Sequence, residues 1–177
     1  MVTQTFNRST YMIGLTMCKE VSDKRAPDLG IFKLMSNAPH VLTAFLDFKG
    51  ALEAKSGFTA KEREQIALAV AGYDECLYCA SAHTAIGLKL GLSQKEAGAN
   101  LAGVSEDLTA QIILDGAIEM MANEGNLSAA TMTGLKTVLS ESQITELVAL
   151  VALNIFTNYF NHVASTPCTD FPVVEFD

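Results

Sequence analysis

The sequence has little charge, few aromatic residues and a shortage of positive charge. Of its 177 residues, 18% are charged and 49% are hydrophobic, a balance that excludes an intrinsically disordered chain. Its 12 basic residues against 20 acidic ones give a net charge of −8, which argues against binding to nucleic acid or to an anionic membrane surface. Trp is absent and the aromatic share is 7%, whereas Ala, Leu and Met are abundant, which favours helices over strands.

Long apolar runs and cysteine-rich segments are also missing. No uninterrupted apolar run reaches the roughly 18 residues of a membrane-spanning helix. The N-terminal apolar run is broken by Thr16 and no small-residue cleavage site follows it, so we expect no signal peptide and a cytoplasmic location. Four cysteines do not make a disulfide scaffold, and stable disulfides are rare in a reducing cytoplasm. Cys18 and Cys168 match no motif and are interpreted as buried or incidental thiols.

Helical spacing of apolar residues runs through every long segment, and no segment alternates with period two. We therefore predict an all-α fold of about seven or eight helices, in a single domain over residues 1–177. We expect a redox core at about 40–103, a second helical half at about 106–165 and an extended tail at 166–177. The mean hydropathy of +0.24 is high for a monomer and predicts a homo-oligomer.

Cap residues mark the starts of several predicted helices. Thr59 with Glu62 and Ser93 with Glu96 each have the spacing of a capping box. A short irregular N-terminal part with one or two short helices precedes them. The longer helices are expected within residues 36–57, 59–72, 76–91, 93–102, 105–125, 128–140 and 140–165.

A faint internal repeat is visible at an offset of 81 residues. It aligns Glu62 with Gln143 and Tyr78 with Tyr159. Apolar helices that share a cap resemble one another by default. The repeat is therefore open to two interpretations, a weak internal duplication or coincidence.

The residues that carry chemistry gather in the stretch EREQIALAVAGYDECLYCASAHTAIG. Cys76 and Cys79 are three positions apart, which places both thiols on one face of a helix and lets them close a disulfide. His83 follows on the same face, where an imidazole can accept a thiol proton. Glu64 lies on the preceding helix, and a hairpin after Gly72 would return it to that face. A buried carboxyl group with a raised pKa makes a good proton shuttle.

Other interpretations of this stretch remain open. Cys76, Cys79 and His83 supply three ligands of the type that structural zinc uses, with Glu64 as the candidate fourth. The same residues are also compatible with plain packing, or with a non-catalytic thiol pair that senses redox state. Covalent haem is excluded, because Ala80 stands where that motif requires histidine.

The more acidic cysteine is predicted differently by two arguments. Cys76 lies near a helix N-terminus, where the helix dipole lowers a thiol pKa. Cys79 lies four residues before His83, and this neighbour favours Cys79 as the thiol that loses its proton. A further polar row, Asn154, Asn158 and His162, is expected either to line a pocket or subunit contact, or to face solvent.

The pattern Glu64-x11-Cys76-x2-Cys79-x3-His83 resembles that of the AhpD-like, carboxymuconolactone decarboxylase-related alkylhydroperoxidases. SNAPHVLTAFLDF and FTAKEREQIALAVA are similar to core segments of that family, and NYFNHVASTPCTDFP is similar to the tail of its peroxidase-related branch. The resemblance covers roughly residues 30–175.

This resemblance implies an AhpD-like helical fold that assembles as trimers or hexamers, and a thiol peroxidase or disulfide reductase without a bound cofactor. The cysteine matching Cys79 attacks a hydroperoxide and the one matching Cys76 resolves it, while Glu64 and His83 relay protons. A dithiol protein or small thiol is the implied reductant. Relatives named for lactone decarboxylation lack the cysteine pair, so that activity is not carried over. Tyr78 departs from the pattern, because the peroxidases of the family have histidine there.

Overall fold

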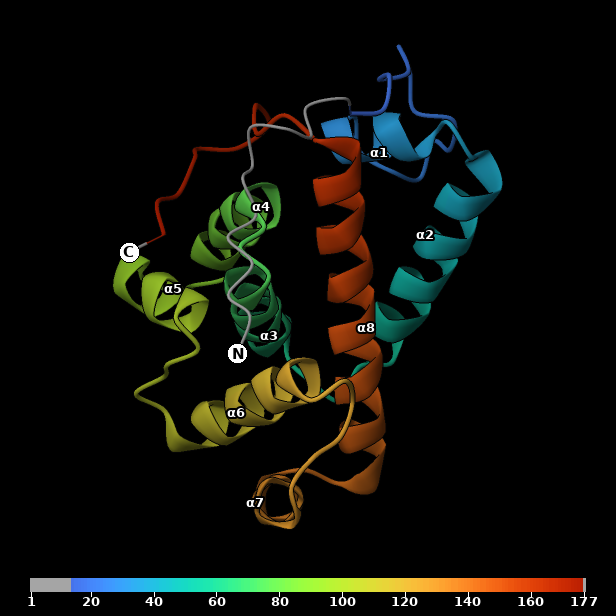
Figure 1. The fold of residues 1–177 in the computed structure, drawn as a ribbon. Helices are drawn as coiled ribbons and strands as arrows, with labels where there is room; N and C mark the ends of the chain where they lie inside the picture. Colours follow the sequence, from blue (N-terminus) through green and yellow to red (C-terminus); the bar gives the residue numbers. More distant parts are fainter. Residues whose placement is uncertain (1–13, 177) are drawn as a thin grey trace, which may run out of the picture.

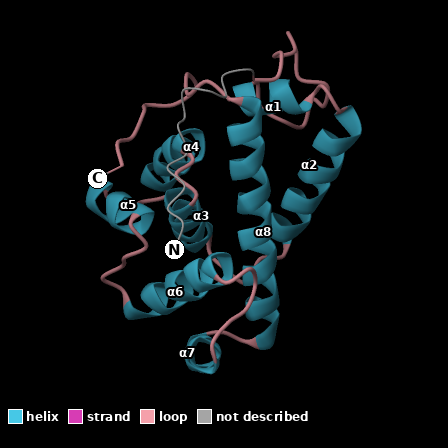
Figure 2. Ribbon diagram, viewed as in Figure 1, coloured by secondary structure: helices cyan, strands magenta, loops and turns pink. Residues whose placement is uncertain are grey.

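The computed structural model describes residues 14–176, in which it has eight α-helices and no strand (Figures 1 and 2). In chain order the helices are α1 Gly30–Met35, α2 Pro39–Ala54, α3 Ala60–Tyr73, α4 Leu77–Lys89, α5 Gln94–Leu101, α6 Leu108–Ala122, α7 Ala129–Val138 and α8 Glu141–Ala164. The predicted all-α fold is confirmed. The expected irregular N-terminal part contains α1, and its first residues, 1–13, lie outside the described part.

The helix at the centre of the packing is α3, which contacts α4, α5, α6 and α8. Its residues 65–71 are all buried, because small alanine and valine side chains let neighbouring helices approach from every side. Gly72 permits the closest of these approaches. A Cβ atom at Gly72 would lie 1.9 Å from the carbonyl oxygen of Leu101 at the end of α5, so only glycine fits.

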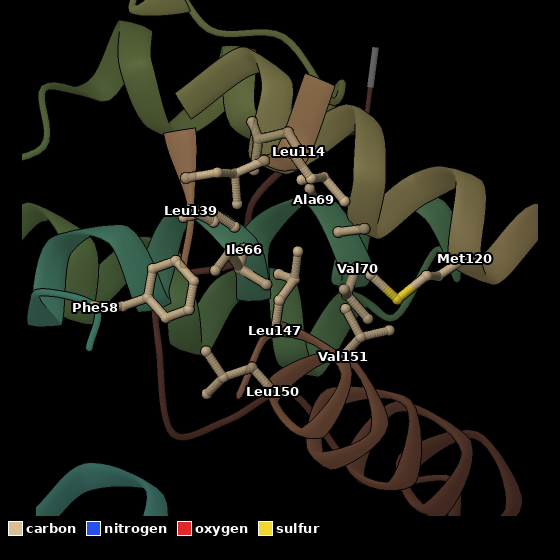
Figure 3. Packing of buried hydrophobic residues seen from close by; sticks show 13 residues of the cluster. Phe58, Ile66, Ala69, Val70, Leu114, Met120, Leu139, Leu147, Leu150 and Val151 are labelled. Carbon is tan, nitrogen blue, oxygen red and sulfur yellow. The ribbon is translucent and has the colours of Figure 1, made fainter. Parts of the chain in front are cut away.

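One apolar cluster ties α3 to α6, α7 and α8 (Figure 3). Ile66 and Val70 of α3 pack there with Leu114 of α6 and with Leu147 and Val151 of α8. Burying a side chain of this size stabilises the fold by about 1.5–3 kcal/mol. The cluster therefore fixes the position of α8 against α3. This position matters because the candidate functional residues follow the C-terminal end of α3.

The predicted capping boxes are present. Thr59 starts α3 and Ser93 starts α5, each with the reciprocal glutamate bond, and Ser140 starts α8 with a third box. The two segments that the internal repeat aligns therefore begin alike and pack against each other. However, α8 continues as one helix where the first segment breaks after Tyr73, and the duplication stays a prediction.

Figure 1 shows α8 running through the middle of the molecule, and it contacts α2, α3, α4, α6 and α7. By length and composition alone α8 could also cross a membrane, a property that it shares with the core helices of soluble proteins. Its mean hydropathy is high enough for a membrane span, although polar residues interrupt its apolar runs. Its contacts with five other helices identify it as a core helix of this fold.

Candidate active site at the junction of α3 and α4

The turn that joins α3 to α4 places the first cysteine. The amide of Glu75 bonds to the Gly72 carbonyl and the amide of Cys76 bonds to the Ala71 carbonyl, which is the pattern of a Schellman motif. Glu75 has a φ of 51° in this turn, a left-handed conformation that costs a non-glycine residue on the order of 1 kcal/mol. The next residue, Cys76, is the N-cap of α4. The sequence-based expectation that Cys76 lies at a new helix start is confirmed.

The two cysteines contact each other across the first turn of α4. The Sγ atom of Cys76 accepts the backbone N–H of Cys79 at 3.3 Å. Both residues are free thiols, with 1% of Cys76 and 3% of Cys79 exposed. The pair is therefore close enough to exchange a proton and is shielded from bulk water.

The surroundings favour a negative charge on Cys76. A hydrogen bond from the Cys79 thiol lowers the pKa of Cys76, and the Cys79 backbone amide and the charge of His83 act in the same direction against the effect of burial. The same thiol bond, together with burial, raises the pKa of Cys79. The acidity predicted from the helix dipole therefore agrees with the structure, whereas the charge of His83 acts on Cys76 rather than chiefly on Cys79.

His83 and Glu64 form an ion pair between α4 and α3. The Nδ1 atom of His83 lies 2.7 Å from Oε2 of Glu64, and the side chains are 22% and 16% exposed. Burial disfavours the charged ring, but the charge and hydrogen bond of Glu64 outweigh it and raise the pKa of His83. The hairpin between the two helices thus brings Glu64 to His83, as the sequence suggested.

Two asparagines of α8 complete the surroundings of the pair. Asn161 donates from Nδ2 to Sγ of Cys79 at 3.1 Å. Asn158 donates to the Val70 carbonyl at 3.2 Å and to Oδ2 of Asp74 at 2.9 Å, which holds the end of α3. Burial raises the pKa of Asp74, against the hydrogen bond from Asn158.

The three residues of the polar row expected on α8 differ in their burial. Asn154 and Asn158 are buried, whereas His162 is exposed. Asn154 donates to the Leu150 carbonyl of its own helix at 2.8 Å and, within the described residues, makes no hydrogen bond to the cysteine pair. The residue that does reach the pair, Asn161, was missed because it is one position away from the i, i+4, i+8 row.

Tyr78, between the cysteines, bonds to the C-terminal tail. Its hydroxyl donates to Oδ2 of Asp170 at 2.6 Å, and its ring packs edge-on against Phe171. Asp170 also accepts the amide of Gly30 at 2.8 Å. Burial, reinforced by Asp170, raises the pKa of Tyr78, so this phenol stays protonated and serves as a donor.

The remaining thiols and the cavities lie apart from this chemistry. Cys168 packs at the start of α4, with its Sγ atom 4.0 Å from the Leu77 carbonyl, and Cys18 is half-buried. Cavities of about 720 and 760 Å³ lie at the starts of α3, α5 and α6 and beneath the tail, and neither is lined by Cys76 or Cys79. Within residues 14–176, no group of three or more His, Cys, Asp or Glu side chains is arranged to hold a metal ion, so the zinc interpretation has no geometric support.

Residues 39–111, which include the whole constellation, match the model of the Carboxymuconolactone decarboxylase family. Over these residues the chain is similar to this family. No curated protein matches it. The resemblance to this family inferred from Glu64, Cys76, Cys79 and His83 is therefore confirmed over residues 39–111.

Solved structures show the same fold. An AhpD-core, peroxidase-related protein from Ralstonia eutropha JMP134 is similar with a TM-score of 0.71 and 23% identity, over 81% of this chain and 78% of that one. The debrominase Bmp8, solved with 2,3,4-tribromopyrrole, has a TM-score of 0.70 and 19% identity over 80% and 76%. A putative antioxidant defence protein from Agrobacterium tumefaciens has a TM-score of 0.64 and 16% identity over 80% and 96%.

These similarities identify an AhpD-like fold. The names of the family and of its structural relatives cover decarboxylation, debromination and peroxide-related defence. These names describe those proteins, and they do not select one reaction.

Proposed function

We propose that this protein is a cytoplasmic antioxidant enzyme, a thiol-dependent peroxidase or disulfide reductase that uses Cys76 and Cys79 as its redox pair. The observation that carries the proposal is the hydrogen bond between these two buried cysteines, with the His83–Glu64 ion pair beside them. A thiolate stabilised in this way is the reactive form of cysteine. The ion pair supplies a group that can give and take protons during the reaction.

The proposed peroxide step begins with proton transfer inside the pair. When the pair carries one negative charge, its contacts favour that charge on Cys76, and the proton of Cys79 passes to Cys76 before the attack. The Cys79 thiolate then attacks the terminal oxygen of a hydroperoxide. A sulfur–oxygen bond forms, the oxygen–oxygen bond breaks, and the departing alkoxide takes a proton from His83.

The second step closes the disulfide. His83 accepts the proton of Cys76, the Cys76 thiolate attacks the sulfenic acid on Cys79, and hydroxide leaves as water with the proton from His83. The peroxide is thereby reduced to an alcohol and water, and the two thiols are oxidised to one disulfide. A dithiol protein or small thiol would then reduce the pair by exchange. Glu64 keeps the imidazole in place for each transfer.

A homo-oligomer, a trimer or hexamer, is part of the proposal. Val148, Phe156, Tyr159 and Val163 lie on one side of α8 and are each 39–74% exposed. Such a row of exposed apolar side chains is typical of a contact with another subunit. Mass measurement in solution by light scattering tests this part independently of the chemistry.

The assignment of roles is tested by trapping sulfenic acid with a dimedone probe in Cys76→Ser and Cys79→Ser after exposure to an alkyl hydroperoxide. The proposal predicts a trapped sulfenic acid on Cys79 in Cys76→Ser and none on Cys76 in Cys79→Ser. The reverse pattern would assign the attack to Cys76. Peroxide consumption with a dithiol reductant then separates an enzyme from a sensor, which would be oxidised once without turnover.

A further inference from the structure

The side chain of Asn161 is buried beside the cysteine pair. It is 4% exposed and comes from a helix that lies more than eighty residues further along the chain than its partner Cys79. Its Nδ2 atom donates to the Cys79 sulfur at 3.1 Å, whereas its Oδ1 atom is buried and has no hydrogen-bond partner in the described part of the chain. An amide placed in this way costs free energy, because burial removes water from an oxygen that nothing else satisfies.

The neighbouring asparagine shows that the position of this part of α8 is fixed. Asn158, 1% exposed, is anchored by the Val70 carbonyl and by the Asp74 carboxylate. These two bonds hold α8 against the end of α3, one turn below Asn161. The bonds of Asn158 therefore fix the position from which Asn161 donates to the sulfur.

We propose that Asn161 is a catalytic residue that makes Cys79 the attacking sulfur, by donating a hydrogen bond to its thiolate. The inference rests on the proposed function and deepens it. In the resting pair, hydrogen bonding and the charge of His83 favour the thiolate on Cys76, so attack by Cys79 requires a group that stabilises charge on the second sulfur. Asn161 donates to that sulfur from outside the pair at 3.1 Å. The same amide also lowers the pKa of Cys76, so its donor stabilises the negative charge on Cys76 in the resting pair and on Cys79 once the proton leaves that sulfur.

The charged groups around Cys79 allow this contribution to be measured. They are Cys76, Asp74 and, beyond Cys76, the His83–Glu64 pair. Replacing Cys76 by serine removes the coupled titration and preserves a good N-cap. In this background, the pH midpoint of Cys79 alkylation by iodoacetamide, followed by peptide mapping, reports the acidity of Cys79 alone.

The test compares Asn161→Ala and the isosteric Asn161→Asp with the matched control Asn154→Ala, all in the Cys76→Ser background. Asn154 is also a buried asparagine of α8, but it bonds only to its own helix backbone in the structure. Hydrogen bonds to charged groups have strengths that correspond to about one pKa unit or more. We expect the midpoint to rise by about one unit in Asn161→Ala and further in Asn161→Asp, which adds a negative charge, and to stay unchanged in Asn154→Ala.

An unchanged or lower midpoint in both Asn161 variants would overturn the inference. If alkylation is too slow to follow, the ultraviolet absorbance of the thiolate gives the same midpoint. The inference and the proposed function fail separately. If the pH midpoint of Cys79 is unaltered in the Asn161 variants while wild type still loses two thiols to a hydroperoxide, only the role of Asn161 is refuted. If the wild-type thiols do not react with the hydroperoxide, the peroxidase proposal is refuted.

Discussion

Replacing Glu64 by glutamine should lower the pKa of His83 while keeping the shape of the site. Oε2 of Glu64 lies 2.7 Å from Nδ1 of His83, and both side chains are largely buried. A carboxylate this close favours the charged imidazole and so raises its pKa. A hydrogen bond to a charged group contributes about 1.5–3 kcal/mol, and the partial exposure of the pair places the expected loss toward the lower end of this range. Burial, which opposes the charged ring, would then dominate.

Nuclear magnetic resonance can measure this change directly, because the chain has only 3 histidines. The C–H resonances of His83 are assigned by comparison with His83→Gln and titrated in wild type and Glu64→Gln. Glu62→Gln is the matched control, because Glu62 belongs to the same helix but caps its N-terminus, where glutamine also satisfies a capping box. A His83 midpoint that stays at the wild-type value in Glu64→Gln would refute the ion-pair reasoning.

The same pair should make stability depend on pH in a defined direction. The folded-state pKa of His83 is raised above the ordinary value of 6.5, so the folded state binds the proton more tightly than the unfolded chain. The stabilisation is fully present below the unfolded value and is lost as pH rises through the folded pKa. The difference in unfolding free energy between wild type and Glu64→Gln should therefore shrink as pH is raised through this window.

Three further predictions concern the core, the tail and metal binding. Leu147→Ala should lower the free energy of unfolding in urea by about 2–5 kcal/mol, whereas Leu108→Ala, at an 80% exposed leucine of α6, should change it by less than about 0.5 kcal/mol; equal effects would contradict the core assignment. Tyr78→Phe should cost roughly 1 kcal/mol and speed proteolysis within residues 166–176, and an unaltered cleavage rate would show that the bond to Asp170 does not hold the tail. Removing metal with a chelator should leave the thermal midpoint unchanged, because the described part of the chain has no cluster suited to a metal ion; a lower midpoint would revive the zinc interpretation.

The helices and the first half of the site could be predicted because their signals are local. Capping boxes depend on residues three apart, and so does the placement of Cys76 and Cys79 on one turn. The approach of Glu64 to His83 followed from a hairpin between consecutive helices. In each case the sequence distance is short, and the geometry of a helix determines the result.

Asn161 could not be found in this way, because its partner Cys79 lies in another helix far along the chain. The packing of Leu147 and Val151 against α3 determines which side of α8 faces the cysteines. No local sequence pattern predicts this orientation. A row starting at Asn154 with spacing i, i+4, i+7 would have included Asn161 in place of the exposed His162. Similarly, no local feature shows that Tyr78 bonds to Asp170 in the tail.

The most direct test of the central claim is a count of free thiols before and after one equivalent of an alkyl hydroperoxide, in wild type and in Cys79→Ser. The account predicts that wild type rapidly loses two thiols, mapped to Cys76 and Cys79, and that Cys79→Ser does not. If wild type keeps all of its thiols under these conditions, the pair is structural and the proposed peroxidase chemistry is wrong.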